Sequence, residues 1–140
     1  MLYFCMVRIN RNTLDQQMLK QLLTQCAFVV SPQQPSHAQT VLGELLGYEE
    51  QVTVAKRVAC IVLLVEGISP YKISRHVKLS QSTVANIHNR LLNNQYRTIL
   101  QLLGKNKTDY FHILKTLDSI LHLGGILPHY NGLNRYKYSN

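Results

Sequence analysis

The sequence of 140 residues has no apolar run of the ~18–20 residues that a membrane-spanning helix needs. The apolar stretch at residues 1–7 is too short for a signal peptide, and no basic region precedes it. The three cysteines are odd in number and far apart, without the spacing of a zinc site. We therefore expect reduced thiols in a cytoplasmic protein that does not associate with a membrane.

Acidic residues are scarce, with 7 Asp and Glu against 15 Lys and Arg. An enzyme such as a transposase needs metal-binding carboxylates or a positioned nucleophile, and few carboxylates exist here to supply them. The sequence also has no GxxxxGK[ST] loop, and its six histidines form no HExxH motif or other metal-ligand spacing. We expect no catalytic residues, no metal and no cofactor, so the protein is not predicted to be an enzyme.

The net charge of +8 is confined to one half of the chain. Residues 1–66 contain five basic and five acidic residues, whereas residues 67–140 contain ten basic residues and two acidic ones. Between Glu66 and Asp109 there are seven basic residues and no acidic one. Such one-sided charge favours a polyanionic partner, nucleic acid before an anionic membrane.

Apolar residues recur at helical spacing along the chain, and no alternating β pattern of useful length occurs, so we predict an all-α protein. Residues 12–30 are expected to form an amphipathic helix that ends at the two prolines within residues 31–36. Ser36 is the expected N-cap of a second helix, and Gly47 is its expected C-terminal cap.

A third helix is predicted over residues 49–66. Its centre, residues 58–65, is apolar on every side, which marks a buried helix. In a domain this small, we expect burial on all sides to require a second subunit.

Residues 69–92 fit a helix-turn-helix. Ser69 can cap a helix that begins at Pro70, and Ser80 can cap the next helix after a brief turn. Two helices joined by so short a turn must cross steeply, and the inner positions carry small or apolar residues that suit this crossing. These residues are Ser74, Leu79, Val84 and Ile87. The turn residue Lys78 often needs a positive φ in such motifs, which costs a non-glycine residue about 1 kcal/mol.

The exposed side of the second helix carries amides and hydroxyls, which both donate and accept hydrogen bonds as the reading of base edges requires. In helix-turn-helix proteins the N-terminal residues of this helix usually contact the bases. We therefore assign base contacts to Gln81, Ser82 and Thr83 first, and to Asn86 next. The alternative is that these side chains only solvate an exposed helix, with Thr83 partly a packing residue. The phosphate contacts are assigned to Lys72, Arg75, Lys78 and Arg90.

Residues 45–58, residues 63–67 and the helix-turn-helix resemble the bacterial Trp repressor family. The similarity extends more loosely back to Asn12. The resemblance implies a helical domain over residues 1–103 that forms an intertwined homodimer on a palindromic DNA operator.

The resemblance implies that two arginines bind the tryptophan corepressor in this family. Arg57 matches the first, whereas Asn86 stands at the position of the second. Loss of that cation removes the partner of the ligand's carboxylate, so tryptophan control is not expected. Arg57 remains the candidate contact for an unidentified small-molecule effector. Its alternative role is a salt bridge to Glu49, Glu50 or Glu66.

Residues 104–140 lie beyond the resemblance. A further helix is predicted to start at Thr108-Asp109 and to stop at Gly124-Gly125, and a tail rich in tyrosines and cations follows. The tail could contact nucleic acid or pack against protein, and we favour packing.

The sequence thus predicts a sequence-specific DNA-binding transcriptional regulator, repressor-like, that binds double-stranded DNA as a homodimer. The alternative is a DNA-binding accessory protein or fragment of a transposase or recombinase system. A third interpretation, a helical adaptor for protein contacts, is disfavoured by the stretch without acidic residues.

Overall fold

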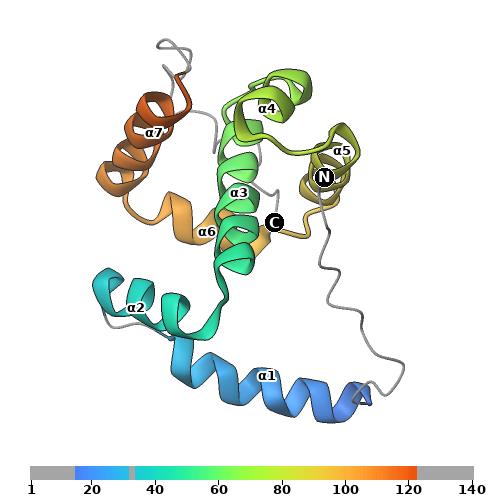
Figure 1. The fold of residues 1–140 in the computed structure, drawn as a ribbon, viewed down its shortest axis with the longest axis vertical. Helices are drawn as coiled ribbons and strands as arrows, with labels where there is room; N and C mark the ends of the chain where they lie inside the picture. The colour runs from blue at the N-terminus through green and yellow to red at the C-terminus, as the bar shows by residue number, and fades with distance from the viewer. Residues whose placement is uncertain (1–14, 32–33, 123–140) are drawn as a thin grey trace. The chain divides into compact units, whose positions relative to one another are not determined.

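The computed structural model describes residues 15–31 and 34–122, and within these ranges the chain forms seven helices and no strand (Figure 1). The helices are α1 (Gln16–Val30), α2 (Pro35–Leu45), α3 (Tyr48–Val65), α4 (Pro70–Val77), α5 (Gln81–Leu92), α6 (Arg97–Gly104) and α7 (Lys107–Leu121). The all-α prediction is confirmed for this part of the chain. None of these helices combines the length and the apolar character needed to cross a membrane.

The chain divides into two compact units after Gln51. In the first unit α1 and α2 contact each other, and α1 begins where the Asp15 carboxylate accepts a hydrogen bond from the Met18 N–H at 2.8 Å. The predicted start at residue 12 lies outside the described residues.

Both caps predicted for α2 are wrong. The helix begins at Pro35, with Gln34 as its N-cap, because a proline at the first helical position gives up only an N–H that would lack a partner there. At the other end α2 stops at Leu45 with Leu46 as its C-cap, and Gly47 directly precedes α3, which begins at Tyr48. The Gly47 N–H donates to the Glu50 carboxylate at 2.8 Å, which is the return bond of a capping box.

The second unit is built around the C-terminal half of α3, where every residue from Cys60 to Val65 is buried. Figure 1 shows α3 between α7 on one side and α4 and α5 on the other. Leu63 belongs to a core cluster with residues of α4, α5 and α6, whereas Val62 packs with Tyr110 and Leu114 of α7. Residues Cys60–Val65 are therefore buried without a second subunit, because α7 of the same chain covers the remaining side, whereas Val58 at the start of the predicted stretch is 42% exposed.

Helix α7 begins slightly earlier than predicted, because the side chain of Asn106 caps it. The Asn106 oxygen accepts hydrogen bonds from the N–H groups of Thr108 and Asp109, at 3.0 and 3.3 Å. The helix ends at Leu121, followed by His122 in the left-handed conformation. The glycines at 124–125 and the tail, which were predicted to follow, lie outside the described residues.

Candidate nucleic-acid interface

Helices α4 and α5 pack against each other and have the predicted cap at each N-terminus. The Ser69 hydroxyl accepts from the Lys72 N–H at 3.3 Å, and Pro70 occupies the first helical position. The Ser80 hydroxyl accepts from the Thr83 N–H at 3.1 Å. Each hydroxyl satisfies a backbone donor that the first turn of a helix leaves without a partner. The two short helices, their serine caps and the brief turn between them are therefore present as predicted.

The turn between the two helices depends on Lys78, whose φ of 58° and ψ of 51° confirm the positive φ predicted for this position. Two hydrogen bonds between Ser74 and Leu79 close the turn. The Leu79 N–H donates to the Ser74 carbonyl at 3.2 Å, and the Ser74 hydroxyl donates to the Leu79 carbonyl at 2.6 Å. A residue as small as serine thus allows the close approach and also supplies a hydrogen bond to the turn.

The inner side of the pair is apolar and buried. Its buried residues are Ile73, Val77, Val84, Ile87 and Leu91. Because these residues also share one core cluster with α3 and α6, the outer side of α5 is held at a fixed place on the second unit.

The side chains assigned to base contacts differ in their exposure to solvent and in their contacts within the protein. Gln81, Ser82 and Asn86 are exposed on α5, as base contacts require, and the Ser82 hydroxyl also lies 3.2 Å from that of Ser80. Thr83 is half-buried, and its hydroxyl lies 2.7 Å from that of Ser80, so it belongs mainly to the cap. The alternative packing role of Thr83 therefore has direct support in the structure.

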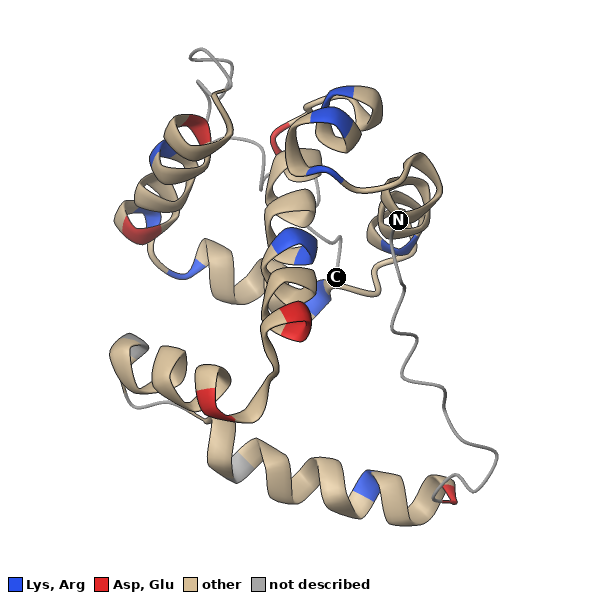
Figure 2. Ribbon diagram, in the orientation of Figure 1, with Lys and Arg blue, Asp and Glu red and all other residues tan. Residues whose placement is uncertain are grey.

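The four assigned phosphate-contact cations are all exposed. Figure 2 shows basic positions along α4 and α5 and no acidic one. Arg75 lies beside the exposed Tyr71, with the guanidinium carbon 5.8 Å from the ring centroid. Arg90 is more tightly held, because its Nε donates to the Gln95 side-chain oxygen at 3.0 Å.

Sequence reasoning missed Lys56 of α3, which is half-buried and whose ammonium donates to the Lys78 carbonyl at 3.1 Å. It also missed Gln95 and Tyr96, which follow α5 and contact Arg90. A usable signal was present in Asn93-Asn94, because asparagine tolerates the left-handed conformation and Asn94 has a φ of 59°.

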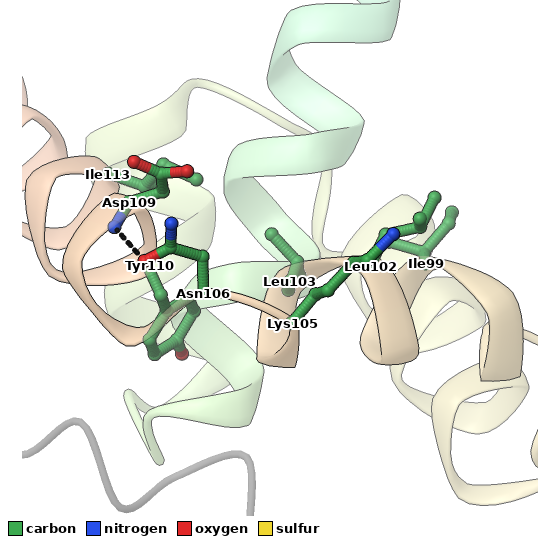
Figure 3. A pocket seen from close by; sticks show the side chains of 8 residues that line it. All are labelled: Ile99, Leu102, Leu103, Lys105, Asn106, Asp109, Tyr110 and Ile113. Carbon is green, nitrogen blue, oxygen red and sulfur yellow. Dashed lines mark hydrogen bonds between the residues drawn. The ribbon is translucent and has the colours of Figure 1, made fainter. Parts of the chain in front are cut away.

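Arg57, the candidate effector contact, is exposed on α3. A separate groove of about 570 Å³ lies between α6 and α7, and neither Arg57 nor Asn86 lines it (Figure 3). Its lining residues are Ile99, Leu102, Leu103, Lys105, Asn106, Asp109, Tyr110 and Ile113. The Tyr110 hydroxyl donates to the Glu66 carboxylate, and burial, followed by this bond and the nearby charge, raises the pKa of Tyr110.

In residues 15–31 and 34–122, no three His, Cys, Asp or Glu side chains gather where they could hold a metal ion. Comparisons of the chain with protein-family models, with curated proteins and with solved structures find no match.

Proposed function

We propose that the protein is a sequence-specific DNA-binding transcriptional regulator that acts as a homodimer and inserts α5 into the major groove. The observation that carries this proposal is the two-sided character of α5. Val84, Ile87 and Leu91 are buried on one side, while Gln81 and Asn86 are exposed on the other. An amphipathic helix of this kind fits the major groove, where its polar side chains meet the donor and acceptor patterns of the bases.

The electrostatics support the same proposal. No acidic residue occurs between Glu66 and Asp109, so nothing on α4 or α5 repels the phosphate backbone. Exposed cations on these helices would position α5 without specifying sequence. Lysine and arginine contacts of this kind release counterions from DNA, which makes binding strongly dependent on salt.

The homodimer has support in the apolar residues that a single chain leaves exposed. Leu23 of α1 is 57% exposed and Leu45 of α2 is 54% exposed. The N-terminal half of α3 adds Val54 and Val58, also exposed. In each unit taken by itself, exposed apolar residues on a helix are typical of an interaction surface. The resemblance to the Trp repressor family implies a second copy of this chain as the partner.

Selection of bound sites from random duplex DNA with the full chain tests both parts of the proposal. A palindromic consensus supports sequence reading by a symmetric dimer, because half-sites mirror the two-fold axis of the protein. Enrichment of a single, asymmetric site would support base reading and contradict the dimer. Absence of any enriched sequence would contradict base reading itself. Repeating the binding measurement at several salt concentrations then tests the electrostatic part.

A further inference from the structure

We infer that Arg90, Gln95 and Tyr96 form a preorganised site for one phosphodiester group of the DNA backbone, with Gln95 and Tyr96 acting as positioning residues for the Arg90 guanidinium. The inference rests on the proposed DNA-binding function. It adds to that function two residues that have no charge and would not themselves attract a phosphate.

The chain folds back on itself at the end of α5. Asn94 adopts the left-handed conformation with a φ of 59°, and its N–H donates to the Leu91 carbonyl at 3.2 Å. The following N–H, that of Gln95, donates to the Arg90 carbonyl at 3.0 Å. This pair of bonds is the usual way for a helix to satisfy its last carbonyls. Its consequence here is that residues 95 and 96 lie next to the last turn of α5.

The turn brings two side chains onto the Arg90 guanidinium. The Arg90 Nε donates to the Gln95 side-chain oxygen at 3.0 Å, so these two residues are joined through both their backbones and their side chains. The guanidinium carbon also lies 4.9 Å from the centroid of the Tyr96 ring, within the range of a cation–π contact. Tyr96 is itself only 9% exposed, so the ring is a fixed support.

These contacts leave the charge of Arg90 available. The bond to Gln95 uses Nε, while the two Nη groups carry four more N–H donors that suit a bidentate contact with phosphate oxygens. An arginine held only for stability would commonly face a carboxylate. Gln95 is a neutral amide, and the surrounding sequence has no acidic residue from position 67 to 108. The guanidinium is therefore oriented without being neutralised.

The location of Arg90 agrees with this role. It follows Asn86 by four residues on the same helix, so the two side chains share one side of α5, about 6 Å apart along its axis. Arg90 is exposed, as Asn86 is. A phosphate contact one turn beyond the base-reading residues would hold α5 at a defined depth in the groove.

The test measures affinity of the full chain for its selected duplex, and the salt dependence of that affinity, in single variants. Arg90→Ala is expected to weaken binding about tenfold and to lower the salt slope by about 1, because one phosphate contact is lost. Gln95→Ala is expected to weaken binding roughly three- to tenfold with the slope unchanged, because the cation remains but must be ordered on binding. Loss of affinity at constant slope, in a variant that unfolds at the wild-type temperature, is the property of a positioning residue.

Three further variants test the roles of Tyr96 and Gln95. Tyr96→Phe keeps the ring and is expected to bind like the wild type, whereas Tyr96→Leu removes the cation–π contact and is expected to bind more weakly. Gln95→Glu keeps the bond to Arg90 but neutralises its charge, so the slope is expected to fall as in Arg90→Ala. Thermal unfolding of each variant separates these effects from loss of structure.

The outcomes distinguish this site from the proposed function. If Arg90→Ala weakens binding while Gln95→Ala and Gln95→Glu bind like the wild type, the positioning role is overturned and the DNA-binding function stands. If Arg90→Ala keeps the wild-type affinity and slope, the phosphate site is overturned although the protein binds DNA. If the wild-type chain selects no duplex, the proposed function itself fails.

Discussion

The side-chain ammonium of Lys56 on α3 donates a hydrogen bond to the carbonyl oxygen of Lys78, with 3.1 Å between the two atoms. The last carbonyls of a helix have no partner within the helix, and a cation at this end also interacts favourably with the helix dipole. At the end of α4, Lys56 supplies both a hydrogen-bond donor for such a carbonyl and a positive charge. The central helix of the second unit is thereby hydrogen-bonded to the turn between α4 and α5. The acceptor residue, Lys78, has a left-handed conformation that is strained for a residue with a Cβ.

Replacing Lys56 should loosen this connection. Lys56→Met keeps most of the aliphatic side chain but removes the ammonium, so we expect the free energy of unfolding to fall by about 0.5–1 kcal/mol. Urea denaturation measures the change. Arg57→Ala is the matched control, because Arg57 is the exposed neighbour on the same helix, and its effect should stay within about 0.5 kcal/mol. Equal losses in both variants would show that the Lys56 contact has no particular role.

The left-handed conformation of Lys78 leads to a second prediction. Lys78→Gly is expected to raise the free energy of unfolding by about 1 kcal/mol, because glycine has no Cβ to strain at a φ of 58°. Lys78→Ala keeps that strain and should not be stabilised. Both variants lack the ammonium, so both should bind DNA more weakly by the same factor in a titration. A glycine variant no more stable than the alanine variant would contradict the assignment of strain to this turn.

Much of the segment from α4 to α5 could be predicted from sequence because its determinants are local. Ser69 and Ser80 cap the helices that directly follow them, and the strain at Lys78 depends on the dihedral angles of one residue. Local rules failed at α2, where Pro35 allowed an earlier start than Ser36 would give. In that case two acceptable caps competed, and the position of the proline decided between them.

What could not be predicted depends on residues that are distant in the sequence. Lys56 precedes its acceptor by 22 positions, and no pattern in either segment identifies the pair. Likewise, Val62 is covered by α7, which lies beyond the range of the family resemblance, so its burial was wrongly attributed to a second subunit. Gln95 meets Arg90 only because Asn94 turns the chain back. In each case the missing information is tertiary packing.

The two cysteines in the described residues should differ in reactivity. Cys60 is fully buried, and burial raises the pKa of its thiol to about 11, whereas Cys26 is exposed. Because the thiolate is the reactive form, Cys60 should resist alkylation in the folded protein at pH 8 and react only when the protein unfolds. Labelling with iodoacetamide, followed by mass spectrometry of peptides, measures each site separately. Cys26→Ser should remove the rapid labelling of its peptide and leave Cys60 protected. Rapid labelling of Cys60 under native conditions would contradict the packing around α3.

The last prediction separates base reading from phosphate contact within the proposed DNA interface. Gln81 is exposed in the first turn of α5, and Lys72 is exposed in the first turn of α4. Gln81→Ala should weaken binding to the selected site by about 1–3 kcal/mol and leave binding to unrelated duplexes nearly unchanged, because an amide contact to a base edge depends on sequence. Lys72→Ala should weaken binding to all duplexes alike and lower the salt slope by about 1, since it removes one charge from the backbone contacts. Fluorescence anisotropy with both kinds of duplex at several salt concentrations measures these quantities. If the two variants lose affinity in the same proportion for every sequence, then Gln81 contributes to binding without reading bases, and its assignment as a base contact is wrong.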